Sequence, residues 1–277
     1  MGFRINTNVS SIAAQRSLTV NGRESESNLA KLSSGSRITK ASDDAAGLAI
    51  SEKMKANIRS LKQADRNAND GISMVQTAEG GLNETSSILT RMRELAIQTS
   101  SDTVGDVERG MSNMEYQNLK QELERISQVT EFNGKKLLDG QGDKYDFQIG
   151  AKNNDFQDRI SYDSSQVSAG MESLGVSELD VSSKQGSQES LAALDGAIEK
   201  VSGSRAFLGA IQNRLVSTSN NLQVNVENLS AANSRIRDVD YAEATATKAK
   251  NDILGAAGTS VLAQANMNGQ SALKLIG

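Results

Sequence analysis

Some residues of this chain place a hydroxyl group three positions before a lysine amine, a spacing that a nucleophilic dyad could use. Examples are Ser271 with Lys274 and Thr245 with Lys248. The sequence contains no histidine and no cysteine, which excludes Ser–His–Asp and Cys–His nucleophile systems. Because serine, threonine and lysine are frequent here, such spacings arise by chance. The sequence therefore predicts that the protein is not an enzyme and has no catalytic residue.

Paired carboxylates offer a second kind of chemistry, since Asp43 with Asp44 and Asp238 with Asp240 could bind Mg²⁺ or Ca²⁺. The alternative for Asp43 and Asp44 is a helix start, where a carboxylate accepts backbone N–H groups and faces the positive end of the dipole. We favour the helix start. Without cysteine or histidine most zinc sites are also excluded, so we expect neither a metal nor another cofactor.

Composition excludes further classes of partner. The formal net charge of −4 argues against nucleic acid, whose binding usually needs a basic excess. There is no run of apolar residues long enough to span a bilayer and none near the start that suits a cleaved signal peptide. Proline is absent, which is typical of a chain that is helical almost throughout.

The elements that organise the chain are two long heptad repeats. Every seventh residue is apolar from Met54 to Ala96, and again from Leu194 to Ile236. A seven-residue repeat keeps one stripe of a helix against a partner helix, so we expect two long helices packed on each other. The expected seam residues are Met54, Leu61, Val75, Leu82, Leu89, Leu208, Leu215, Leu222, Leu229 and Ile236.

Between these repeats the pattern predicts a third helix over 106–130, because apolar residues there follow steps of three and four. Alternation at Tyr145, Phe147 and Ile149, and then from Phe156 to Tyr162, predicts a β-hairpin with its turn near 152–155. Residues 163–190 are rich in serine and glycine without a sustained period, so we expect an exposed loop.

Both ends of the chain have the spacing of amphipathic helices whose apolar stripes have no evident partner except each other. Such terminal helices are often disordered alone and fold on binding. The apolar residues expected to pack in an assembly are Ile5, Val9, Ile12, Leu18, Leu254, Val261, Leu262, Leu273 and Leu275.

Several longer motifs occur in a fixed order along the chain. They include DDAAGLAI at 43–50, FNGKKLL at 132–138, LGAIQNRL at 208–215 and LAQAN at 262–266. In these motifs the sequence resembles bacterial flagellin, the filament subunit of the swimming organelle. The match covers roughly 1–140 and 190–277, and the short segment between them leaves no room for the large outer domains of longer flagellins.

The resemblance implies a mainly α fold: a rod-like antiparallel helical bundle with a small β-hairpin region. It divides the chain into terminal filament-core helices (1–42 with 240–277), a rod-like helical domain (43–140 with 188–239) and a β-hairpin with a short variable loop (141–187). The terminal helices would be disordered in the monomer and would form a coiled coil in the filament.

The function implied is that of a structural subunit, secreted without a cleaved signal peptide, which polymerises into the extracellular flagellar filament. Its implied partners are further copies of itself, the flagellar export apparatus, an export chaperone on the C-terminal helix, and the filament cap and hook-junction proteins. A vertebrate flagellin receptor would contact Arg91, Leu95 and Glu115, the positions that match the family's contact residues. The alternatives are a hook–filament junction protein and an intracellular coiled-coil scaffold.

Overall fold

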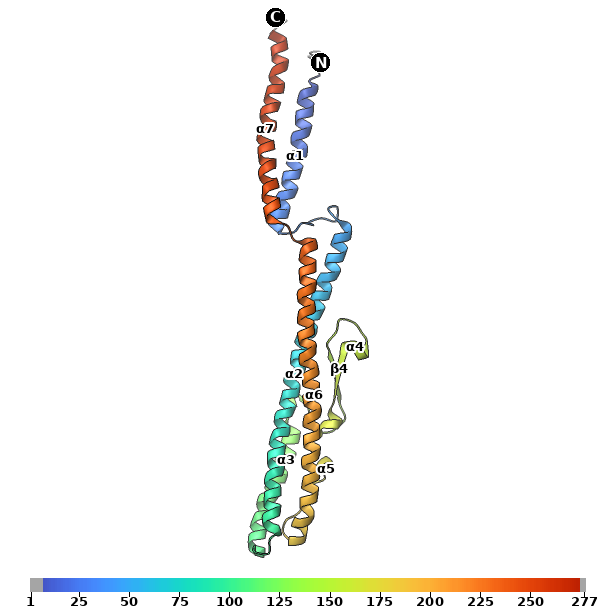
Figure 1. The fold of residues 1–277 in the computed structure, drawn as a ribbon, viewed down its shortest axis with the longest axis vertical. Coiled ribbons are helices and arrows are strands. Elements are labelled where there is room, and N and C mark those ends of the chain that lie inside the picture. Colours follow the sequence, from blue (N-terminus) through green and yellow to red (C-terminus); the bar gives the residue numbers. More distant parts are fainter. Residues whose placement is uncertain (1–6, 275–277) are drawn as a thin grey trace. The chain divides into compact units, whose positions relative to one another are not determined.

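The computed structural model describes residues 7–274, with side chains described up to Met267. It is mainly helical with short antiparallel strands, which confirms the predicted fold class (Figure 1). The long helices are α1 (Val9–Ser34), α2 (Ala45–Ser100), α3 (Asp106–Val129), α6 (Lys184–Arg237) and α7 (Tyr241–Lys274). The shorter elements are β1 (Glu131–Phe132), β2 (Lys135–Lys136), β3 (Lys144–Gln148), α4 (Asp155–Asp158), β4 (Arg159–Asp163), the 3₁₀ turn η1 (Ser164–Val167) and α5 (Met171–Leu174).

Contacts within the chain define two compact units. One unit is formed by the residues up to Ala56 together with those from Asn228 onward, and the other is Asn57–Glu227. The hairpin and the segment that follows it belong to the Asn57–Glu227 unit, whereas the sequence analysis set 141–187 apart as a region of its own.

The core of the Asn57–Glu227 unit lies where α2, α3 and α6 meet. Val75, Leu82 and Leu89 of α2 are buried, as are Leu208 and Leu215 of α6. All of these lie on the two heptad series, so each long helix turns one continuous stripe inward. Helix α3 adds Tyr116 and Leu123, which are also fully buried. Leu222 is 6% exposed, whereas Met54, Leu61, Leu229 and Ile236 toward the ends of the two series are only half-buried.

The hairpin formed by β3 and β4 packs on this bundle. The two strands pair antiparallel with Tyr145 opposite Tyr162, and the two rings stack with their centroids 5.8 Å apart. Phe156, which the alternation assigned to the second strand, instead lies in the short helix α4 at the turn and is 92% exposed. The second strand was predicted to begin too early, because Asp158 turns inward at the turn and accepts hydrogen bonds from the backbone N–H groups of Lys152 and Asn154.

Two glycines let the neighbouring segments approach α2 closely. A Cβ at Gly81 would lie 2.7 Å from Leu138 Cδ1, and a Cβ at Gly71 would lie 3.0 Å from the ring of Phe147. Helix α2 nevertheless continues through both positions without a break. The glycines therefore serve packing, and this compensates for their cost of about 1 kcal/mol each relative to alanine within a helix.

The prediction of an exposed loop over 163–190 is wrong. Val167, Val176 and Val181 are fully buried, and the segment contains η1 and α5 before α6 begins at Lys184. The ammonium group of Lys120 on α3 donates to the carbonyl oxygens of Ser177 and Leu179 at 2.6 and 3.1 Å. This segment covers the helices through isolated apolar side chains at irregular spacing, so no period shows it in the sequence.

In the other unit α1 and α7 lie side by side and antiparallel (Figure 1). Helix α1 is capped by Asn8, whose side chain accepts from the N–H of Ser11, and it ends at Gly35 with φ 68°. The two connecting segments bond to each other: the N–H of Arg37 donates to the carbonyl of Arg237, and the N–H of Val239 donates to that of Gly35.

Asp43 and Asp44 lie in the connector before α2, as expected for a helix start. Asp44 accepts a hydrogen bond from the N–H of Gly47 at 2.8 Å. Asp43 accepts from the N–H groups of Lys40 and Thr39 and from the Thr39 hydroxyl. These hydrogen bonds, with that from Lys40 foremost, hold the pKa of Asp43 below its usual value.

The heptad seam gives a test of stability. Leu222→Asp places a charge on a buried stripe, which should cost about 3 kcal/mol or more and lower the melting temperature by several degrees. Val224→Asp is the matched control, because Val224 lies on the same helix but is 56% exposed. Thermal unfolding followed by circular dichroism measures both. Equal melting temperatures for the two variants would mean that the assigned stripe is wrong.

Candidate self-association surface

The contact between α1 and α7 is a heptad seam made mostly of small and polar side chains. Along α7 the less exposed residues recur at alternating steps of three and four, and along α1 the steps are similar. On α7 they are Ala244, Lys248, Asn251, Gly255, Gly258, Leu262 and Ala265. On α1 they include Asn8, Ser11, Ala14, Leu18, Asn21, Ser25 and Asn28.

Three asparagine amides of α1 cross this seam to the backbone of α7. The Nδ2 atoms of Asn8, Asn21 and Asn28 donate to the carbonyl oxygens of Ala265, Asn251 and Ala244 respectively, each at 2.8 Å. The backbone of α7 is within reach because the seam residues around these carbonyls are mostly small. A half-buried seam of this kind is stabilised by polar contacts and close packing rather than by large apolar side chains.

Apart from Leu18 and Leu262, most of the large apolar side chains of both helices point away from the seam. Val9 and Ile12 on α1 are 63% and 57% exposed, and Ile253 and Val261 on α7 are 69% and 58% exposed. Leu29 and Leu254 are about half exposed as well. A helix pair that buries asparagine and glycine while it exposes isoleucine and valine to water has a surface suited to burial against other molecules.

The residues expected to pack in an assembly therefore fall into separate groups. Val9, Ile12, Leu254 and Val261 face outward, whereas Leu18 and Leu262 are half-buried in the seam between the two helices. Ile5 and Leu275 lie outside the described residues, as does the side chain of Leu273. The seam asparagines were not predicted, although the seven-residue interval between Asn21 and Asn28 was a signal of a shared helix face.

The residues to which the resemblance assigns receptor contact are divided between surface and core. The guanidinium of Arg91 is half exposed and bonds to the carboxylates of Glu115 on α3 and Glu94, both at 2.9 Å. These hydrogen bonds raise the pKa of Arg91, that to Glu94 foremost. Leu95 is only 2% exposed. The resemblance assigns receptor contact to Leu95 as well, but Leu95 has almost no exposed surface because it turns inward with Met92 and Ala96 to the core.

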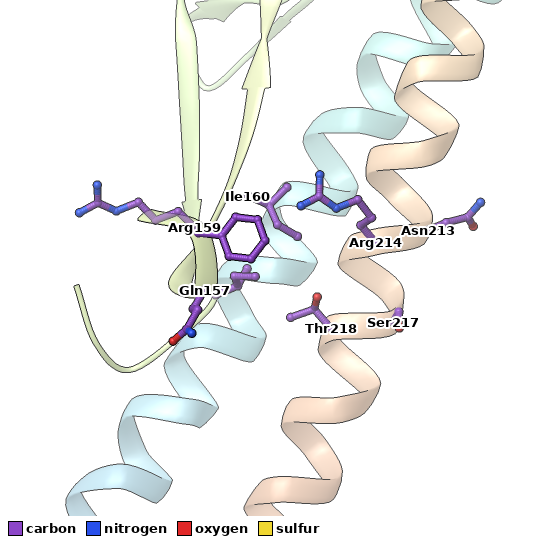
Figure 2. A pocket seen from close by; sticks show the side chains of 9 residues that line it. Gln157, Arg159, Ile160, Asn213, Arg214, Ser217 and Thr218 are labelled. Atoms are coloured by element: carbon purple, nitrogen blue, oxygen red, sulfur yellow. The ribbon is translucent and has the colours of Figure 1, made fainter. Parts of the chain in front are cut away.

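A shallow hollow lies between the β3–β4 hairpin and α6. Figure 2 shows Arg214 and Thr218 reaching from α6 toward the hairpin, where Gln157 and Ile160 lie opposite. It is open to solvent and holds no pairing of a nucleophile with a base. Within residues 7–274 no cluster of acidic side chains is arranged to hold a metal ion. No helix in that range is long and apolar enough to cross a membrane.

Comparison with known proteins assigns these features to one family. Residues 5–143 match the model of the bacterial flagellin N-terminal helical region, and residues 191–276 match that of the C-terminal helical region. A flagellin of Halalkalibacterium halodurans is 44% identical, over 98% of this chain and 99% of its own length. A flagellin of Bacillus subtilis is 41% identical, over 99% of this chain and 100% of its own length.

Two further similar proteins are also a flagellin and a flagellar filament core protein. The flagellar filament core protein flaB2 of Brachyspira hyodysenteriae is 40% identical over 98% of this chain and 99% of its own. Among solved structures, Bacillus cereus flagellin has a TM-score of 0.50 and 29% identity, and the match covers 61% of this chain and 94% of that chain. With both helical regions matched in order and relatives aligned over nearly its full length, the chain belongs to the bacterial flagellin family.

Proposed function

We propose that this chain is a structural subunit that polymerises into the helical bacterial flagellar filament used for swimming. The observation that carries the proposal is the α1–α7 pair, in which mostly small and polar side chains fill the seam and most of the large apolar ones face outward. The exposed apolar surface of this helix pair is removed from water, with a gain in free energy, only when other copies cover it.

The size of the driving force is adequate for assembly. Complete burial of one valine, leucine or isoleucine side chain contributes about 1.5–3 kcal/mol. Covering the outward faces of Val9, Ile12, Ile253 and Val261 therefore supplies several kcal/mol per subunit before the entropy of association is subtracted. A contact between different surfaces of successive copies generates an open helical polymer when its rotation does not close a ring.

The location proposed for the assembled chain is the extracellular filament of the flagellum. The subunit would pass through the flagellar export apparatus without a cleaved signal peptide, with a chaperone on the C-terminal helix. The filament cap and hook-junction proteins would be its neighbours at the ends of the filament. A chain with no cysteine and no proline suits this route, because it forms no disulfide and has no slow prolyl isomerisation.

The alternatives are less well supported. A hook–filament junction protein is not favoured, because the relatives that align over nearly the whole chain are flagellins and a filament core protein. An intracellular scaffold is not favoured for the same reason. The role proposed is structural and requires no catalytic residue or cofactor.

Substitution of the outer apolar face tests this role. Ile12→Ser with Ile253→Ser should prevent growth of filaments from seeds, since it removes apolar surface that only neighbouring copies would cover. Unit Asn57–Glu227 should keep its helical content and melting temperature. The control is Val107→Ser with Val129→Ser on α3, which are 69% and 58% exposed. Sedimentation and electron microscopy measure polymer, and circular dichroism measures the fold.

The outcome that contradicts the proposal is normal filament growth by the Ile12→Ser, Ile253→Ser chain. Loss of filament growth in the control variant alone would place the decisive contacts on α3 and would contradict the role given to the α1–α7 pair. Removal of residues 1–35 is a second check, because it deletes α1 and should likewise stop polymerisation.

The finer partner proposed is a vertebrate flagellin receptor that binds the face carrying Arg91 and Glu115. Support comes from the ion pair at 2.9 Å between these two side chains, which joins α2 to α3 and leaves about half of each side chain exposed. Arginine supplies a planar set of donors that suits an interface anchor. Leu95 would contribute only by supporting Arg91 from the core, so it is left unchanged in the test.

A single substitution tests this partner. Arg91→Ala should weaken activation of receptor-bearing reporter cells by monomeric protein about tenfold or more, which is typical of losing an interface hot spot. Arg93→Ala is the matched control: Arg93 is also exposed but pairs with Asp195 on α6. An unchanged response to Arg91→Ala, with the fold intact by circular dichroism, would remove this residue from the receptor site.

A further inference from the structure

The seam between α1 and α7 raises the question of what fixes the register of the two helices. The asparagine amides do so only in part, because they donate to backbone carbonyl oxygens and every residue of α7 has one. Where the connectors meet, the bonds from Arg37 to Arg237 and from Val239 to Gly35 also hold the register. If those bonds open, a uniform seam of small residues would let the helices move by one heptad and form equivalent amide hydrogen bonds. Register needs a contact that depends on side-chain identity.

One such contact is present, between Leu18 and Gly258. A Cβ atom built on Gly258 would lie 2.7 Å from Cδ2 and 3.1 Å from Cγ of Leu18. Relief would require Cγ itself to move, so rotation of a methyl group is not enough. Leu18 therefore occupies space on α7 that is free only because residue 258 has no side chain.

The neighbouring heptad positions of α7 could not take Leu18 in the same way. The row that faces α1 at seven-residue intervals is Ala244, Asn251, Gly258 and Ala265. Within this row glycine occurs only at 258, so a shift of one heptad in either direction would bring Leu18 against a residue with a Cβ. The leucine and the glycine together form a knob and a hole that match in one register.

We propose that Leu18 seated on Gly258 sets the register of α1 against α7, while the amides of Asn8, Asn21 and Asn28 hold the two helices close on either side of it. A shift of one heptad would keep the same side chains outward but would change which residues of α7 each residue of α1 lies beside. The lock therefore determines how the outward residues of α1, among them Val9 and Ile12, are aligned with those of α7, among them Ile253 and Val261. Its consequence for assembly rests on the proposed function, whereas the register itself does not.

Introduced cysteine pairs can read the register, since the chain has no cysteine of its own. The Oγ atom of Ser11 lies 2.9 Å from Oδ1 of Asn266, so Ser11→Cys with Asn266→Cys reports the observed register. Ser11→Cys with Thr259→Cys reports a shift of one heptad. The ratio of the two disulfide yields under mild oxidation is measured in the full-length chain, both in solution and in sedimented polymer.

Single and reciprocal substitutions then test the lock. Leu18→Gly removes the knob and Gly258→Leu fills the hole, so each should lower the ratio about tenfold, or about 1.4 kcal/mol. The double variant, Leu18→Gly with Gly258→Leu, places the knob on the other helix with the same composition. It should restore the ratio to within about threefold of wild type, because the coupling belongs to the pair.

A matched glycine substitution separates the lock from helix propensity. Gly258→Ala and Gly255→Ala both favour the helix by about 1 kcal/mol. A Cβ on Gly255 would lie 3.5 Å from Asn21 Nδ2, which is an ordinary contact distance. Only Gly258→Ala should lower the ratio, and this variant remains informative if the reciprocal exchange fails to fold.

The proposal is overturned if the two alanine variants give equal ratios, or if wild type shows no preference in either state. It is also overturned if a folded double variant fails to recover the preference lost in the single variants. A wild-type chain that prefers the observed register but forms no filaments from seeds would contradict the proposed function and leave the register lock in place.

Discussion

The seam between α1 and α7 is filled mostly by small or polar side chains, so most of the apolar surface of these helices is left outside it. The backbones can then approach closely enough for asparagine amides to reach carbonyl oxygens across the interface. Because the inner positions are taken by asparagine, glycine and alanine, isoleucine and valine are left for the outside. The tendency of the chain to associate with further copies thus follows from the way α1 packs on α7.

The Asn57–Glu227 unit shows the opposite use of the same period. There the heptad positions hold leucine and valine, and the helices bury them against one another and against the segment that follows β4. That unit has a core of its own, with Tyr116 and Leu123 of α3 at its centre. One repeat length therefore produces a self-sufficient bundle in one part of the chain and an interface in need of partners in another, depending on which side chains occupy the repeat.

Helices whose apolar residues recur at regular steps were the elements that could best be predicted from the sequence. The long heptad helices and the bounds of α3 could be predicted because apolar residues mark a face at regular steps. The cover provided by Val167, Val176 and Val181 could not, since isolated apolar residues among serines and glycines carry no period. The seam of α1 and α7 does not show in the apolar pattern, because most of its inward positions are asparagine, glycine, serine and alanine. The burial of Leu95 could not be predicted from the motif that it belongs to, because a motif does not say which way a side chain turns.

The hydrogen bonds between the α1–α2 connector and the α6–α7 connector have a mechanical consequence. The N–H of Arg37 bonds to the carbonyl of Arg237, the N–H of Val239 bonds to that of Gly35, and the Arg37 guanidinium adds a bond to the carbonyl of Ile236. A pull along either connector is therefore passed to the other through these bonds before one connector straightens alone. For a subunit of a rotating structure, the joint would carry tension through both passages of the chain together.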